Sequence, residues 1–178
     1  MERLTNATNT RTLIATILHP GAFLGNTLNY LKPVYFNGNS YVYSIPIRET
    51  LFLCGLFNSF VIDFILRQRV ATHANMFYVS ELPIPRYSDT DRFFSEVTDR
   101  VGSLICTTKE YDRLKIDAKI KNSVTDEPTR QLLIAQINAY VAKIYELTQE
   151  ELEYILDSFP IVEKSIKESV LFEFNNIS

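Results

Sequence analysis

Apolar runs in the first half of the chain have the lengths and flanks of strands in a small sheet. Residues 12–18 are apolar and rich in β-branched side chains, which is typical of a buried strand. Residues 28–36 and 41–45 flank Asn37-Gly38, a pair that favours a tight turn, so we expect two hairpin strands there. A further strand is expected over residues 77–82, before a proline-rich exit. The pattern predicts a small mixed sheet.

An apolar stretch over residues 48–69 predicts one long helix. It is apolar nearly all round, so it should be buried centrally against the sheet. Its apolar part is shorter than the roughly 20 residues that a membrane span needs, and Asn58 and Asp63 interrupt it. We therefore expect a buried helix in a cytoplasmic protein that has no membrane partner. The expected core residues of this helix are Leu53, Leu56, Phe57, Phe60, Phe64 and Ile65.

The second half of the chain has helical patterns throughout. Ser88 and Asp91 have the spacing of a helix N-terminus before an apolar periodicity at Phe93, Phe94, Val97, Val101 and Leu104. A charged helical stretch is expected over residues 109–121, and further helices start at residues 126, 148 and 161. The whole pattern predicts an α+β fold, with a recognition unit at residues 1–87 and a helical tail at residues 88–178 packed on it.

Charge is distributed unevenly between these two halves. The net charge of the 178-residue chain is −3, but residues 1–87 hold 7 Lys/Arg and 4 Asp/Glu, a balance of +3. Residues 88–178 hold 11 Lys/Arg and 17 Asp/Glu, a balance of −6. The first half could therefore face the phosphates of a nucleic acid, whereas the acidic second half should not.

The sequence has no recognisable catalytic or metal-binding motif. His19 and His73 are isolated, and no spacing of cysteines or carboxylates completes a metal site around them. Cys54 lies inside the apolar helix, where a cysteine is most simply a small buried hydrophobe. No serine or cysteine has a histidine partner in a known nucleophile motif. We expect that the chain is not itself an enzyme.

Five segments, in a fixed order, resemble a known family. They are Arg11-Thr12-Leu13-Ile14-Ala15-Thr16 with the Gly25-Asn26-Thr27 turn, Leu56-Phe57-Asn58-Ser59, Arg67-Gln68-Arg69 with His73, Asn75, Phe77 and Tyr78, Leu82-Pro83-Ile84-Pro85, and a later helix around Gln136-Ile137-Asn138 that is followed by Phe159-Pro160. Together they resemble the C-terminal target-recognition region of adenine-specific DNA methyltransferases, especially type IIG restriction–modification and phage-defence enzymes. The chain departs from the family at Asn138 and Glu146, where Asp and Gly are common.

The resemblance implies a specificity-domain-like fold and a non-catalytic module that grips duplex DNA. The Gly-rich S-adenosylmethionine loop and the Asn-Pro-Pro-Tyr motif of such enzymes are missing from the sequence. We therefore expect a C-terminal fragment without a cofactor of its own, whose partners are duplex DNA and the methyltransferase domain of the same parent polypeptide. S-adenosylmethionine would belong to that domain. The implied DNA-contacting residues are Arg11, Arg67, Arg69, Thr72, His73 and Asn75. Arg67 and Arg69 should then lie exposed on one positive face, with His73 or Asn75 nearby.

Each of these assignments has a simpler alternative. Arg67 and Arg69 could be ordinary cations at an exposed helix C-terminus, and Arg11 could serve either role. Asn58 and Ser59 are interpreted as a structural polar pair that bonds the backbone of a neighbouring segment. The tyrosines at positions 30, 35, 41 and 43 could stack on unpaired bases or simply pack in a sheet. The chain as a whole could instead be a protein–protein docking module without DNA contact.

Overall fold

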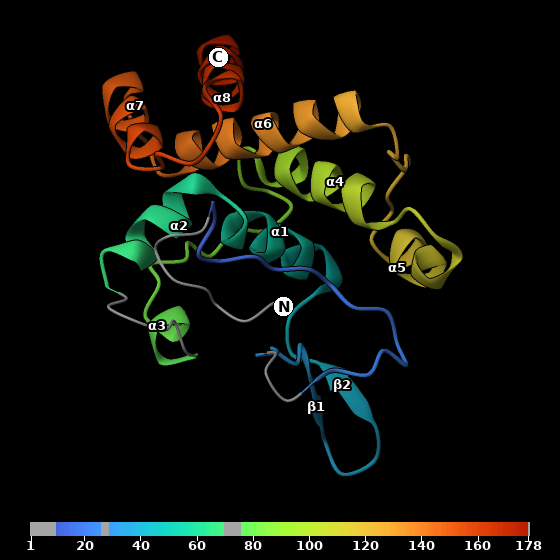
Figure 1. The fold of residues 1–178 in the computed structure, drawn as a ribbon. Helices are drawn as coiled ribbons and strands as arrows, with labels where there is room; N and C mark the ends of the chain where they lie inside the picture. Colours follow the sequence, from blue (N-terminus) through green and yellow to red (C-terminus); the bar gives the residue numbers. More distant parts are fainter. Residues whose placement is uncertain (1–9, 26–28, 70–75, 178) are drawn as a thin grey trace.

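The computed structural model describes residues 10–25, 29–69 and 76–177, and it is mostly helical (Figure 1). The fold is α+β, as the sequence predicts. The elements in chain order are β1 (Val34–Phe36), β2 (Tyr41–Tyr43), α1 (Ile47–Phe57), α2 (Phe60–Arg67), α3 (Met76–Ser80), α4 (Phe94–Ile105), the short 3-10 helix η1 (Lys109–Tyr111), α5 (Asp112–Asp117), α6 (Glu127–Ile144), α7 (Gln149–Asp157) and α8 (Lys164–Asn176).

The predicted hairpin is confirmed, but it is the whole sheet among the described residues. Strands β1 and β2 pair antiparallel, with Val34 opposite Tyr43 and Phe36 opposite Tyr41. The turn forms because the Asn37 carboxamide oxygen accepts bonds from the backbone N–H groups of Asn39 and Ser40, both at 3.0 Å. Gly38 takes a φ of 99°, a conformation that a residue with a Cβ rarely adopts. The predicted small mixed sheet is therefore a two-stranded ribbon.

Two of the predicted strands are wrong. Residues 12–18 run extended with alternating burial, but they pair with no strand in the part of the chain that is described. Residues 77–82 were expected to be a strand, and most of them belong to the helix α3. A strand at this position would have no ladder to join, whereas a helical turn bonds its own backbone, as the 3.3 Å bond from Leu82 N to Val79 O illustrates.

The predicted central helix is two helices. α1 ends at Phe57, and α2 begins after Ser59 at an angle of 61° to it. Ser59 caps α2, because its Oγ accepts a bond of 3.2 Å from the Ile62 N–H. Within the described ranges no single helix is long and apolar enough to span a membrane. Only the bent pair α1–α2 reaches that length and composition.

The helical second half agrees with the sequence, apart from three boundaries, one of which is the start of α8 at Lys164 instead of residue 161. α4 begins at Phe94, six residues after Ser88, because Ser88 and Asp91 close a separate turn and Phe93 has a φ of 67°. The charged stretch is only η1 and α5, and it stops before Lys119, which has a φ of 57°. α6 starts at the Asp126 cap with proline in its first turn, and α7 starts at the predicted capping box.

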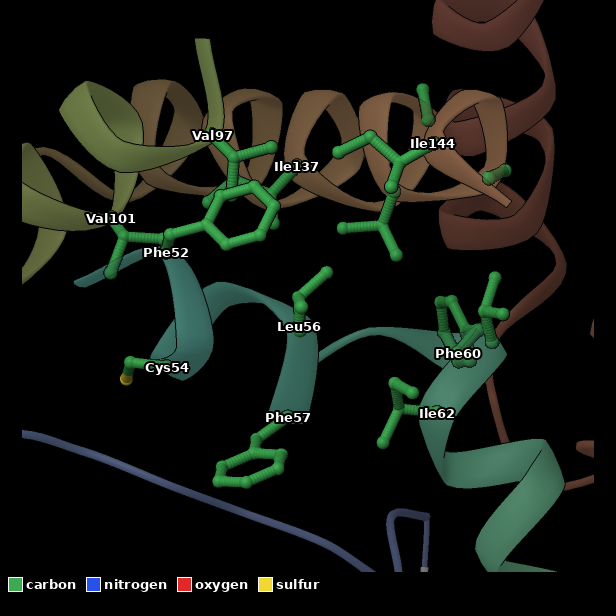
Figure 2. Packing of buried hydrophobic residues seen from close by; sticks show 14 of the residues in the cluster. Phe52, Cys54, Leu56, Phe57, Phe60, Ile62, Val97, Val101, Ile137 and Ile144 are labelled. Atoms are coloured by element: carbon green, nitrogen blue, oxygen red, sulfur yellow. The ribbon is translucent and has the colours of Figure 1, made fainter. Parts of the chain in front are cut away.

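One hydrophobic core joins the two halves of the chain. α1 packs on α4, α4 packs on α6, α2 contacts α6 and α7, and α8 lies on α6 and α7. Figure 2 shows Leu56 pointing toward α6, while Phe57 points to the other side, toward the N-terminal segment. Of the six expected core residues, Leu56, Phe57 and Phe60 are buried, and the rest are partly buried against the cluster. The domain boundary at residue 87 stays a prediction.

A close approach of α1 and α4 sets the geometry of this core. A Cβ added to Gly55 would lie 2.7 Å from Val97 Cγ1 and 2.9 Å from Val101 Cγ2. Glycine at this position therefore allows the two helices to approach more closely than any residue with a side chain would. The approach keeps α1 in the middle of the molecule, between α4 and the extended N-terminal segment (Figure 1).

Candidate nucleic-acid interface

The structure describes three of the six residues that were expected to contact DNA. Thr72, His73 and Asn75 lie outside the described residues. Arg11 lies at the start of the extended N-terminal segment, and Arg67 is the last residue of α2. The two arginines are 56 positions apart, yet they meet at one carboxylate, that of Asp63. Sequence reasoning noted Asp63 only as an interruption of an apolar helix.

Asp63 is completely buried and is shared by several donors. Arg11 Nε lies 3.0 Å from one carboxylate oxygen, and Arg67 Nε lies 3.5 Å from the other. The backbone N–H of Thr12 reaches both oxygens, at 3.0 and 3.1 Å. A buried carboxylate is stable only when its charge is balanced and its lone pairs accept bonds, and both conditions are met. Asp63 therefore ties the N-terminal segment to α2.

The two guanidinium groups are also fixed on their other sides. Arg11 donates to the backbone oxygen of Asn58, and its guanidinium carbon lies 4.2 Å from the centre of the Phe60 ring. Arg67 donates to Thr10 O at 3.2 Å and lies 4.2 Å over the ring of Phe159. We refer to Asp63, Arg11 and Arg67 as the Asp63 network. Phe159 comes from the loop between α7 and α8, so this network reaches into the helical tail.

Burial governs the electrostatics of this network. Desolvation lowers the pKa of Arg11 from its ordinary value, Asp63 acts to raise it, and the neighbouring Arg67 adds to the lowering. The side chain of Arg11 is 18% exposed and that of Arg67 is 10% exposed. Arg67 was expected to lie exposed on a positive face, and that expectation is wrong. Its guanidinium is directed inward, because a buried carboxylate and an aromatic face hold it there.

Asn58 and Ser59 make the contacts of structural residues. Asn58 Oδ1 accepts from the Ala15 N–H at 3.1 Å, and Asn58 Nδ2 donates to Ala15 O at 2.8 Å. Its amide thus bonds both backbone groups of one residue, as a neighbouring strand would. Nδ2 also donates to Cys54 O at 2.8 Å. Ser59 Oγ donates to Leu56 O at 2.7 Å while it caps α2. The pair fills the break between α1 and α2.

Asn138 is a further polar residue of this region, and the sequence offered little sign of its role. It is buried on α6, its Oδ1 accepts from the Phe60 N–H at 2.8 Å, and its Nδ2 donates to Ile134 O at 2.8 Å. The bond satisfies a donor in the first turn of α2 that has no partner within the helix. An Asp, which the resembling family commonly has here, could accept the same bond but could not donate to Ile134.

Arg69 is the described candidate whose side chain is substantially exposed, at 42%. Its Nη1 donates to Glu81 O at 2.9 Å and lies 3.9 Å from the Glu81 carboxylate. A pair of this kind on the surface is weak and is screened by salt, so Arg69 can turn to a phosphate at little cost.

The charge excess of residues 1–87 overstates the cations that are available to a ligand. Arg48 is held by the carboxylates of Asp89 at 2.8 Å and Asp99 at 2.9 Å, and its side chain is 17% exposed. Arg11 and Arg67 are held by Asp63. Among the described cations of that half, Lys32, Arg69 and Arg86 remain as exposed side chains. Any nucleic-acid surface here has a low charge density.

The described residues indicate no metal site, and the comparisons indicate no family. No group of three His, Cys, Asp or Glu side chains in the described part of the chain is arranged to hold a metal ion. Comparisons with protein-family models, with curated proteins and with solved structures found no match for this chain. The geometry and the sequence therefore carry the functional argument.

Proposed function

We propose that this chain is a non-catalytic DNA target-recognition module, part of an adenine-specific DNA methyltransferase or restriction–modification enzyme. The observation that supports the proposal is the meeting of the resembling segments. Arg11, Asn58, Arg67, Asn138 and Phe159 come from separate stretches of sequence, and all lie at or beside the Asp63 network. Segments that build one buried site have a physical reason to occur together in a family.

The network suggests a division of labour within the proposed module. Arg11 and Arg67 are positioning residues, which join the N-terminal segment, the end of α2 and the tail. Arg69 follows on the exposed side and would contact a phosphate. Thr72, His73 and Asn75, which come next in sequence, are proposed to contact DNA as the resemblance implies, with Asn75 suited to adenine. In the parent enzyme, the methyltransferase domain would bind S-adenosylmethionine and carry out the chemistry.

Fluorescence anisotropy with labelled duplex DNA tests this proposal directly. The 178-residue chain should bind weakly, with a non-specific Kd of roughly 10⁻⁴–10⁻⁶ M that rises with salt. Arg69→Ala should weaken binding and reduce the salt slope by about 1, because one phosphate contact is lost. Lys164→Ala is the matched control, since Lys164 is an exposed cation of α8 that is paired with Glu168.

Two results would contradict the proposal. One is the absence of duplex binding at low salt, and the other is an equal effect of the Arg69 and Lys164 variants. In the parent enzyme, Asn75→Ala should relax sequence preference if Asn75 reads a base. Unchanged sequence preference there would remove Asn75 from the proposed contacts without affecting the rest.

A second candidate function, protein–protein docking, is favoured by one observation. Ten of the sixteen exposed large hydrophobic side chains among the described residues fall between positions 14 and 43. An apolar groove of about 380 Å³ lies under this segment, with Leu18, Tyr30, Leu53 and Phe57 among its lining residues. Exposed apolar surface of this kind is typical of a docking site. This candidate predicts no affinity for DNA, so the same anisotropy experiment separates the two.

A further inference from the structure

The hairpin presents an aromatic face that the fold itself does not use. Phe36, Tyr41 and Tyr43 lie on one face of the β1–β2 ribbon, because cross-strand partners share a face and positions alternate along each strand. Their exposed fractions are 58%, 77% and 60%. The rings of Phe36 and Tyr41 are 5.4 Å apart, so the face is continuous along one edge. We refer to these three residues as the aromatic face.

The position of the hairpin leaves this face accessible. Figure 1 shows the ribbon projecting from the helical body, on the opposite side of α1 from α6. A two-stranded hairpin is only marginally stable alone, and stable sheets cover an apolar face with a helix or another sheet. Three aromatic rings that stay more than half exposed are therefore suited to contact with something outside the described chain.

The charges around the aromatic face favour an anionic ligand. The sequence has no Asp or Glu between Arg3 and Arg48, so the hairpin and its flanks carry no carboxylate. Lys32 lies just before β1, with its Nζ 5.4 Å from the centre of the Tyr30 ring. On α5, Arg113 is close enough to Tyr43 to interact with it electrostatically, although Arg113 is paired with Asp117. Asp112 and Asp117 are the carboxylates on that helix.

Exposed aromatic rings on a sheet face, with cations beside them, are a means by which proteins hold unpaired nucleotides. A duplex offers its bases only at groove edges, so planar rings cannot stack on them. We propose that the aromatic face stacks on unpaired bases of DNA. This inference rests on the proposed function, because an enzyme that turns a base out of the duplex exposes unpaired bases beside its recognition module.

The test uses the 178-residue chain and a labelled oligothymidine of 12 nucleotides at low salt. Tyrosine fluorescence is the second readout, since the chain has 10 tyrosines, two of them on the aromatic face, and no tryptophan to mask them. We expect saturable anisotropy together with tyrosine quenching. The double change Tyr41→Leu with Tyr43→Leu keeps the face apolar but removes the rings, and it should weaken single-strand binding by at least about tenfold. Tyr154→Leu, at an exposed tyrosine of α7, should have no effect.

Circular dichroism and the urea midpoint establish whether the double variant folds, and single Tyr41→Leu replaces it if the hairpin is lost. The inference is overturned if wild type does not bind the oligothymidine, or if the Leu variants bind it as tightly as wild type.

Duplex binding that still depends on Arg69 would in that case continue to support the proposed function. Loss of duplex binding alone, with single-strand binding intact, would instead contradict the proposed function. Capture of the parent methyltransferase domain through Tyr41 and Tyr43, without single-strand binding, would make this face a protein docking surface.

Discussion

The Asp63 network and the aromatic face both depart from the usual distribution of side chains. The network buries charged groups, and the aromatic face exposes aromatic rings. The network holds three charged groups with little access to solvent, and each of them has bonding partners. The hairpin holds three aromatic rings in solvent, and their exposed fractions all exceed one half. A buried charge that is paired with groups from several elements serves the fold. An exposed ring with little cover contributes little to the fold, so a ligand is the simpler explanation for it.

The comparison also separates structural residues from candidate ligand-contacting residues, which the sequence alone did not distinguish. Arginines were expected to form the ligand surface, and tyrosines on the hairpin were more simply ordinary sheet residues. In the structure, two of the three described candidate arginines are internal connectors, whereas the tyrosines are exposed. The measurements below test whether the two regions really differ in this way.

The largest effect is expected for Asp63→Ala. The change leaves two guanidiniums without their carboxylate and the Thr12 N–H without its acceptor, which should cost about 3–5 kcal/mol of unfolding free energy. Urea unfolding followed by circular dichroism gives this value. Asp117→Ala is the control, because its pair with Arg113 is exposed and should contribute less than about 1 kcal/mol. A loss below 1 kcal/mol for Asp63→Ala would show that the network does not hold the fold.

Leu56→Ala should cost about 2–5 kcal/mol, because Leu56 is fully buried between α1 and α6 and a cavity would remain (Figure 2). The same urea experiment measures it. Leu132→Ala provides the comparison, since Leu132 lies on α6 with 42% of its surface exposed and should lose far less stability. Equal losses for the two variants would mean that α1 is not the centre of the core.

The buried thiol beside the network predicts a dependence on alkaline pH. Burial raises the pKa of Cys54 from an ordinary value of 9.0 to about 12. Above pH 9 the unfolded thiol loses its proton while the folded one keeps it, so stability falls as the pH rises from 9 toward 12. The slope due to this group is at most about 1.4 kcal/mol per pH unit.

Urea unfolding of wild type and Cys54→Ala at pH 7, 9, 10 and 11 measures this dependence. The variant should lose less stability than wild type above pH 9. It should retain some slope, because burial also raises the pKa values of Cys106, Tyr140 and Tyr145. Adding Tyr145→Phe should reduce the remaining slope further. Parallel curves for wild type and Cys54→Ala would show that the thiol is accessible to water.

The smallest effect on stability is expected for Tyr41→Ser, in the exposed aromatic face. Its side chain is 77% exposed, so the unfolding free energy should change by less than about 0.5 kcal/mol. A loss above about 1.5 kcal/mol would mean that the hairpin packs on the body of the protein, and the aromatic face would then be a structural feature.

Local patterns were sufficient for most of the helices. The capping box at Thr148 and Glu151, the Asp126 cap with the following Pro128, and the Asn37-Gly38 turn all act within a few residues of themselves. Such signals depend on bonds between near neighbours, so they can be read without knowing the fold. The central position of the apolar stretch was also predictable, because its hydrophobicity requires burial on every side.

The strands over residues 12–18 and 77–82 were not predictable in this way, because a strand exists only if a partner strand lies beside it. For residues 12–18 the partner is a side chain, Asn58, which bonds both backbone groups of Ala15. Residues 77–82 instead close a helical turn in α3. The break at Asn58 and Ser59 likewise depends on distant residues. Ala15 lies 43 residues before Asn58, and Asn138 lies 78 residues after Phe60.

The sequence by itself determined which residues could carry charge or stack on a base, and it determined the helices, the hairpin turn and the burial of the central apolar stretch. Only the tertiary structure decided that Arg11 and Arg67 share Asp63, while Arg69, two residues further on, stays exposed. The physical reason is that residue type sets what a side chain can bond, whereas burial and distant partners set what it does bond. A lone carboxylate in an apolar helix can be buried only where the fold brings cations beside it.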